Sequence, residues 1–168
     1  MSVEGAVDIG PSTDFREGKG LQVDVQGRAL CVFRYEETLY ALDNHCYHMG
    51  GPLSVGDIED LVVEHDNTNE NTHHPCVVCP WHSYKISLKT GERLYKHQDI
   101  FGTVPPQTKS LGKKQRTHVV YENSDTGRVF VALNKDNNTS FPSDRYASEE
   151  MYELMKRAAA GNRRRKQK

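Results

Sequence analysis

Residues 46–52 read Cys-Tyr-His-Met-Gly-Gly-Pro, and residues 79–82 read Cys-Pro-Trp-His. Each of these two boxes offers one thiol and one imidazole, and thirty residues, 49 to 78, separate the ligands of the first box from those of the second. One box alone cannot fill a four-coordinate metal site. The fold must therefore bring the boxes together, and the candidate metal ligands are Cys46, His48, Cys79 and His82.

Ligands of these types suit two different cofactors. Zinc would take all of them in one tetrahedral site. A cluster of two irons and two sulfides would take both thiolates on one iron and both imidazoles on the other. Because the ligand set fits either cofactor, the residues around the boxes must decide between them.

The surrounding residues resemble the cluster-binding loops of the Rieske family. The shared pattern is Cys46-x-His48-x-Gly50-Gly51-Pro52-Leu53, then Gly56-Asp57, then Cys79-Pro80-x-His82, then Tyr84-x-Ile86-x-x-x-Thr90-Gly91. The resemblance extends over about residues 20 to 147, includes the run Lys113-Lys114-Gln115-Arg116-Thr117-His118, and is closest to soluble animal members of the family. It implies a Rieske 2Fe–2S cluster, with Cys46 and Cys79 on the inner iron and His48 and His82 on the outer, near-surface iron.

The same resemblance implies that a set of neighbouring residues shapes the surroundings of the cluster. These residues are Gly50, Gly51, Leu53, Pro80, Trp81, Ser83 and Tyr84. High-potential Rieske proteins carry a Ser two residues past the second His and a Tyr four residues past it, and both donate hydrogen bonds to sulfur. Tyr84 and Ile86 hold those positions here, so we expect a potential on the order of −150 mV, at the low end of the Rieske range.

The remaining cysteines, Cys31 and Cys76, lie in apolar runs and are predicted to pack in the core. A redox dithiol at Cys76-x-x-Cys79 is the alternative, although Cys79 is already a candidate ligand. Respiratory-type Rieske proteins carry an additional Cys in each loop, and the two form a disulfide. Gly51 and Trp81 stand at those places, so that disulfide is absent and we expect a cytoplasmic protein.

The resemblance implies an all-β fold, an antiparallel Rieske sandwich with a smaller cluster-binding subdomain, followed by a short C-terminal helix. We expect the Rieske 2Fe–2S domain over residues 1–142, its cluster-binding subdomain at about 43–95, and the helix with a basic tail over 143–168. Apolar and polar residues alternate as strands require in the runs 21–25, 83–88, 117–121 and 129–133, and residues 29–35 are more continuously apolar. Further strands are expected over residues 38–42, 61–64 and 76–78.

The sequence also predicts the local structure of three segments outside these strands. Residues 65–75 are predicted to form a polar loop. Residues 96–114 are predicted to be irregular, because Pro105-Pro106 interrupts them. Residues 147–160 are predicted to form a helix that Ser148 caps and Gly161 ends.

The charge of this chain of 168 residues is uneven, although its formal net charge is only −1. Residues 156–168 carry seven basic residues and no acid, which leaves −8 on residues 1–155. No apolar run approaches the roughly 18 residues of a membrane span, and the N-terminus lacks the regions of a signal peptide. We expect a monomer without a membrane span, whose tail is solvated rather than bound to nucleic acid.

These observations and the resemblance imply a soluble Rieske-type ferredoxin. It would be a one-electron carrier of low potential that passes electrons from a reductase to an oxygenase or a similar acceptor. It would not be an enzyme by itself, because the sequence has no nicotinamide or flavin fingerprint, nucleophile set or mononuclear iron triad. The alternative is a zinc-binding structural or regulatory module whose basic tail docks a partner or nucleic acid.

Overall fold

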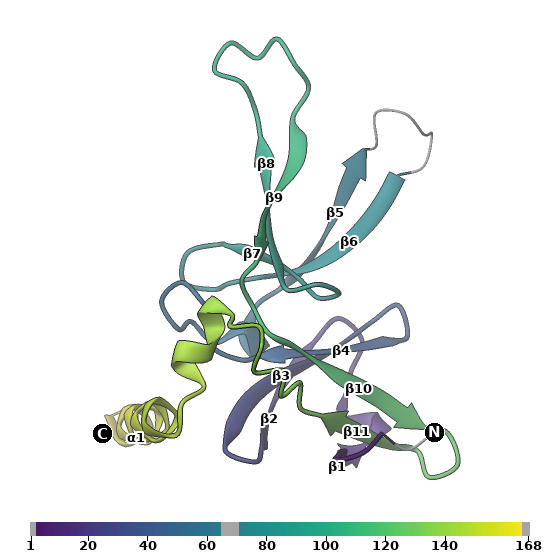
Figure 1. The fold of residues 1–168 in the computed structure, drawn as a ribbon, viewed down its shortest axis with the longest axis vertical. Helices are drawn as coiled ribbons and strands as arrows, with labels where there is room; N and C mark the ends of the chain where they lie inside the picture. The colour runs from purple at the N-terminus through teal and green to yellow at the C-terminus, as the bar shows by residue number, and fades with distance from the viewer. Residues whose placement is uncertain (1–2, 65–70, 166–168) are drawn as a thin grey trace.

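The computed structural model describes residues 3–64 and 71–165, which form two antiparallel β-sheets, three short 3-10 helices and one α-helix (Figure 1). The six-stranded sheet has the order β1-β11-β10-β4-β3-β2, and the five-stranded sheet has the order β5-β6-β7-β8-β9. The expected all-β fold with a C-terminal helix is therefore confirmed. The domain boundary at residues 142/143 remains a prediction.

The six-stranded sheet contains alternating runs and one continuously apolar run, β3, which is buried on both faces. The first meander comprises β2 (Gly20–Val25), β3 (Arg28–Tyr35) and β4 (Thr38–Asp43), and the last hairpin comprises β10 (Thr117–Asn123) and β11 (Arg128–Ala132). β10 pairs with β4, so the last hairpin lies beside the strand that leads into the first ligand box. The sequence patterns missed β1 (Val7–Pro11), which pairs with β11.

The five-stranded sheet carries two hairpins that extend away from the other sheet (Figure 1). Its strands are β5 (Ile58–Glu64), β6 (Asn71–Val78), β7 (Lys85–Ser87), β8 (Glu92–His97) and β9 (Gln107–Lys113). The Thr108 hydroxyl donates a hydrogen bond to the Val62 carbonyl at 2.9 Å, which brings the outer strands β5 and β9 together. The sheet is therefore curled.

Two expectations for this sheet are wrong. Residues 96–114 are not irregular throughout, because β8 continues to His97 and β9 begins at Gln107, directly after Pro105-Pro106. The two prolines lie in the hairpin connection, where their missing N–H groups cost the sheet no hydrogen bond. The polar loop expected over residues 65–75 is shorter at its C-terminal end, because β6 begins at Asn71; residues 65–70 lie outside the described residues.

β3 separates two hydrophobic cores, because successive side chains of a strand point to opposite faces. Leu30 and Val32 face a core that is completed mainly by β11 and β4. On the other face, Cys31 and Phe33 meet side chains from both sheets. The members of this second core are Cys31, Phe33, Leu42, Cys46, Leu53, Val77, Cys79, Ile86 and Leu88. Both candidate ligand thiols are therefore part of the hydrophobic interior.

The chain after β11 forms η3 (Pro142–Tyr146) and α1 (Glu149–Arg165), which together we call the C-terminal arm. Ser148 caps α1 as predicted, since its Oγ accepts a hydrogen bond from the Met151 N–H at 3.2 Å. The predicted end at Gly161 is wrong, because the helix continues to Arg165. A glycine inside a helix costs only about 1 kcal/mol relative to alanine, and it does not by itself stop the helix.

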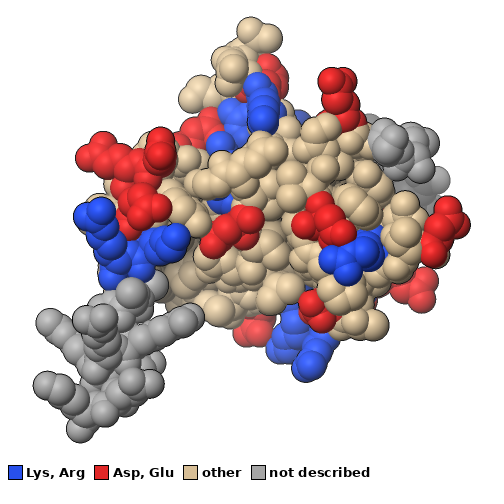
Figure 2. Space-filling view, turned by 90° about the horizontal axis from the view of Figure 1, so that it is seen from below, with Lys and Arg blue, Asp and Glu red and all other residues tan. Residues whose placement is uncertain are grey.

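Charged side chains of both signs are spread over the face shown in Figure 2. Figure 2 shows Lys and Arg side chains gathered where α1 meets the grey C-terminal residues, with Asp and Glu side chains close by. Between residues 3 and 165, apart from 65–70, no helix combines the length and the apolar character needed to cross a membrane.

Candidate metal centre

The first ligand box forms a tight loop that is closed by its own backbone. The Cys46 N–H donates to the Gly51 carbonyl, and the Cys46 carbonyl accepts from the Gly50 N–H, both at 2.8 Å. The loop then enters the short helix η2 (Leu53–Val55), whose first N–H donates to the Asn44 carbonyl at 2.8 Å. Cys46 is thus fixed through both of its backbone polar groups.

The second ligand box repeats this arrangement. The Cys79 N–H donates to the Tyr84 carbonyl at 2.8 Å, and the Cys79 carbonyl accepts from the Ser83 N–H at 2.9 Å. The residue four positions after the cysteine has a positive φ in each loop, 80° at Gly50 and 58° at Ser83. Glycine adopts this conformation freely, whereas serine is strained in it. The two boxes are therefore equivalent turns, and only the first has the residue type that the turn favours.

The candidate thiols form a buried pair. Cys46 and Cys79 are 0% and 2% exposed, and the Cys46 thiol lies against the Cys79 thiol. Burial and the proximity of Cys79 raise the pKa of Cys46 to about 12, so a metal must displace its proton. A Cβ on Gly51 would lie only 2.8 Å from the Cys79 sulfur, so the close approach of the two loops requires glycine at this position.

The candidate imidazoles form a second pair. The ring centres of His48 and His82 are 4.7 Å apart, with an interplanar angle of 80°. The Nδ1 atom of His48 is inaccessible to solvent and has no hydrogen-bond partner among the described residues. Burial and the neighbouring charges of His82, Arg93 and Arg145 lower the pKa of His48, which favours the neutral imidazole that binds metals.

These pairs fit a two-iron cluster better than a single metal ion. Among the described residues, no three His, Cys, Asp or Glu side chains gather at one point, as a structural zinc ion would require. A Rieske cluster needs only two thiolates at one iron and two imidazoles at the other. A buried thiol pair beside a partly exposed imidazole pair, with an unpartnered Nδ1, matches that division.

Gln115 holds the first ligand loop in place through hydrogen bonds to its backbone. Its side chain is fully buried, and its Nε2 donates to the Asp43 carbonyl at 2.9 Å and to the His45 carbonyl at 2.8 Å. Its Oε1 accepts from the Tyr47 N–H at 3.0 Å. One side chain therefore satisfies three backbone groups on both sides of Cys46.

Asp43, the last residue of β4, anchors the same loop through charge. It accepts hydrogen bonds from Arg28 at 2.6 and 2.7 Å and from the Ser143 hydroxyl at 2.7 Å, and the His118 ring lies 2.9 Å from it. Burial alone would raise the pKa of Asp43. The hydrogen bonds from Arg28 and His118 outweigh burial, so the pKa of Asp43 lies below its ordinary value.

A second carboxylate extends this network into the C-terminal arm. Asp144 of η3 pairs with Arg116 through two contacts of 2.7 Å and with Arg28 at 2.8 Å. Burial opposes ionisation of Asp144, but hydrogen bonds from Arg116, Phe141 and Arg28 hold its pKa far below the ordinary range. Arg28 bridges the two carboxylates, so the arm is tied to the base of the first loop.

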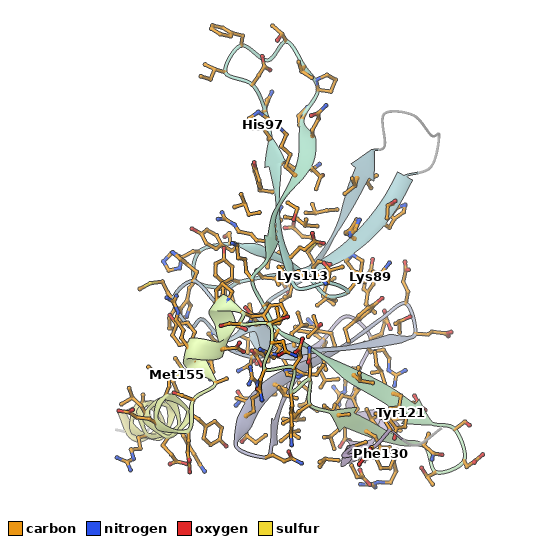
Figure 3. All side chains as sticks on the ribbon, in the orientation of Figure 1. Lys89, His97, Lys113, Tyr121, Phe130 and Met155 are labelled. Atoms are coloured by element: carbon orange, nitrogen blue, oxygen red, sulfur yellow. The ribbon has the colours of Figure 1, made fainter. Side chains whose placement is uncertain are left out.

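The C-terminal arm also touches the outer side of the first loop. The Arg145 guanidinium donates to the carbonyls of Tyr47 and His48, and the Tyr146 hydroxyl donates to the His48 carbonyl at 3.3 Å. Met155 of α1, labelled in Figure 3, places its Cε 2.8 Å from the position that a Cβ on Gly50 would take. The first loop is thus held from both sides.

The residues predicted to surround the cluster differ in their exposure. Leu53 is fully buried in the same core as the two thiols. Pro80 and Ser83 are exposed, and Trp81 is 56% exposed. The Tyr84 ring lies 4.4 Å from the His48 ring. The roles of these residues toward a cluster remain predictions.

The other two cysteines pack as predicted. Cys31 and Cys76 are fully buried, and burial raises the pKa of both thiols, that of Cys76 to about 12. Cys76 lies with Leu61 and Leu94 in a core separate from that of Cys79. The structure therefore gives no support to a redox dithiol at Cys76 and Cys79.

Sequence reasoning missed the residues that hold the ligand loops. Gln115, Arg116 and His118 belong to the run that carried the family resemblance, but no periodicity marked them as buried. Arg145 and Tyr146 lie about a hundred residues from the loop that they touch, so no local pattern could connect them to it. The family resemblance of the run from Lys113 to His118 is the one signal that pointed toward Gln115.

Comparison with known proteins agrees with this geometry. A family model described as soluble Rieske-type ferredoxin matches residues 7–136. A human Rieske domain-containing protein is 38% identical over 134 residues, which cover 78% of this chain and 76% of the relative. The ferredoxin component of a naphthalene 1,2-dioxygenase system from Pseudomonas putida is 30% identical over 82 residues, which cover 49% of this chain and 65% of that protein.

A solved structure shows the same fold. The ferredoxin of carbazole 1,9a-dioxygenase from Nocardioides aromaticivorans IC177 superposes with a TM-score of 0.53 at 20% sequence identity. The match covers 78% of this chain and all of that structure. The C-terminal arm begins after residue 136, where the family match ends.

Proposed function

Because this chain belongs to the soluble Rieske-type ferredoxin family, we propose that it carries single electrons from a reductase to an oxygenase or a similar acceptor. Members of the family carry a Rieske 2Fe–2S cluster and act as electron carriers rather than as catalysts. The cluster, when bound, accepts and releases one electron. The low potential expected from the residues at 84 and 86 is part of the proposal.

Cys46 and Cys79 would hold the inner iron, and His48 and His82 the outer iron. The observation that supports this assignment most strongly is the separation of a buried thiol pair from a partly exposed imidazole pair. The two loops orient these side chains through matching backbone hydrogen bonds. Leu53 and the surrounding core would keep water from the thiol side.

The surface beside the imidazole pair suits a protein partner. Met49 and Trp81, one from each ligand loop, are both 56% exposed. Large apolar side chains that surround a functional group commonly form the centre of a docking site. The positive charges of Arg93 and Arg145 act on His48, so the partner is expected to bring acidic residues to this face. A cytoplasmic, monomeric protein that does not bind nucleic acid remains part of the proposal.

Spectroscopy of the purified protein tests the function and the ligand assignment together. A 2Fe–2S protein is coloured, and a reductive titration should consume one electron per chain. C46S and C79S should lose the visible spectrum, whereas C31A and C76A, which change buried cysteines outside the ligand boxes, should keep it. A colourless protein that contains zinc would contradict the proposal, and so would an unchanged spectrum in C46S.

A further inference from the structure

Arg93 of β8 and the candidate ligand His48 both lie against the ring of Tyr84. Its guanidinium carbon lies 3.7 Å from the centre of the Tyr84 ring. The Tyr84 ring centre lies 4.4 Å from the His48 ring centre, with an interplanar angle of 32°. Arg93 stands opposite Ile86 in the β7–β8 pair, so its backbone is fixed by the sheet. The order in space is therefore guanidinium, phenol ring, imidazole.

The charge of Arg93 is not neutralised by a carboxylate. Its Nε is shielded from solvent and has no hydrogen-bond partner among the described residues, and no ion pair to it is found there. The guanidinium meets aromatic groups instead. Burial raises the pKa of Tyr47, and the nearby Arg93 opposes that rise. A half-buried cation without a counter-ion is rare, since charged groups away from water are normally paired.

We propose that Arg93 has two effects on the cluster, an inference that rests on the proposed function. It positions the Tyr84 ring against His48, and it supplies positive charge that stabilises the reduced state. Arginine stacks on an aromatic face through its planar guanidinium, which lysine cannot reproduce. Arg93 is therefore a positioning residue that also sets the midpoint potential.

The physical reason lies in the charge that reduction adds. The reduced cluster holds one more electron than the oxidised cluster, so a nearby cation favours reduction, and it does so more strongly where water is excluded. Hydroxyl donors to sulfur serve the same purpose in high-potential members, and the residues at those positions here are Tyr84 and Ile86. Arg93 would replace part of that stabilisation by charge.

The experiment compares midpoint potentials of cluster-loaded proteins, with the reductive titration followed by visible circular dichroism. R93Q removes the charge and keeps a polar side chain, and we expect a downward shift of the midpoint potential. R93K restores the charge without the planar stack, and we expect a smaller shift in the same direction. K96Q is the matched control, because Lys96 lies on the same strand but is exposed, so solvent and salt screen its charge. Its midpoint potential should stay at the wild-type value.

The results separate this inference from the proposed function. R93Q with a full cluster and a midpoint potential equal to that of K96Q would overturn the role of Arg93 and leave the ferredoxin function intact. Equal midpoint potentials in R93Q and R93K would show that charge is not the cause. If R93Q does not retain its cluster, the midpoint potentials of R93M and R93K are compared instead, since only the lysine keeps the charge. Equal midpoint potentials in these two variants would overturn the inference. A wild-type protein without any cluster would contradict the proposed function itself.

Discussion

Replacing Gln115 with Met should loosen the first ligand loop and lower the free energy of unfolding. Methionine has a similar length, but it cannot donate to the carbonyls of Asp43 and His45 or accept from the Tyr47 N–H. These three hydrogen bonds measure 2.9, 2.8 and 3.0 Å, and Gln115 is fully buried. Three backbone groups next to Cys46 would therefore lose their partner at once.

The magnitude follows from the burial of those groups. A buried polar group that loses its partner costs about 1–3 kcal/mol. Asp43 is buried and bears the full cost, whereas His45 and Tyr47 are half-buried and can recruit water in part. The expected loss is about 3–5 kcal/mol of unfolding free energy. At about 2–4 °C per kcal/mol for a chain of this size, the melting temperature should fall by about 6–20 °C.

Two measurements check this prediction. Urea unfolding gives the change in free energy, and the decay of visible absorbance in the presence of a chelator gives the lifetime of the cluster. Gln107→Met is the matched control, since Gln107 is exposed at the start of β9 and should change stability by no more than about 0.5 kcal/mol. A loss of less than about 1 kcal/mol in Q115M, with an unchanged cluster lifetime, would refute the argument.

Three further outcomes are expected. Ser83→Gly should raise the unfolding free energy by about 1 kcal/mol in urea unfolding, because glycine relieves the positive φ of 58°; a destabilised variant would count against strain at this turn. Gly91→Ala should lower the unfolding free energy by more than about 3 kcal/mol, because the added Cβ would lie 2.0 Å from the Gln115 carbonyl oxygen at a φ of +71°. A near-neutral result would mean that the β7–β8 turn can move away freely from the connection between β9 and β10. Because the folded pKa values of Asp43 and Asp144 lie below an unfolded value of about 3.9, their stabilisation should be complete above that pH and decline as pH falls toward the folded values. Acid unfolding followed by far-UV circular dichroism checks this, with D144N expected to show a flatter dependence below about pH 4 and an unchanged curve speaking against the ion network.

The sequence predicted those strands and helices that a short run of residues defines without long-range contacts. The alternation in residues 21–25 predicted β2, and the apolar run 29–35 predicted β3, which is buried on both faces. Pro105-Pro106 did not prevent regular structure in residues 96–114, because a proline pair is compatible with a strand that begins immediately after it. α1 passes Gly161 because a helix tolerates one glycine at a modest cost.

The candidate site likewise contains residues that the sequence alone reveals and residues that only the fold reveals. The four ligand positions could be read from two short boxes, because their residue types carry the chemistry themselves. Gln115 and Arg93 could not, because their importance comes from neighbours that only the fold supplies. Arg93 is one cation among many in the sequence, and its place over Tyr84 depends on the pairing of β7 with β8. Long-range contacts of this kind produce no periodic pattern in the sequence.

The contacts from Arg145 and Tyr146 to the first ligand loop bear on the timing of biosynthesis. Arg145 follows His48 by 97 residues. A ribosome that adds about 5–20 residues per second needs on the order of 5–20 s to cover that distance. In the part of this interval that follows the synthesis of His82, the nascent chain already carries both ligand loops, while Arg145 and Tyr146, which contact the first loop, have yet to be synthesised. Iron that arrives during this time would meet a first ligand loop without the contacts from Arg145 and Tyr146. Iron that arrives later would meet a loop that these contacts already hold.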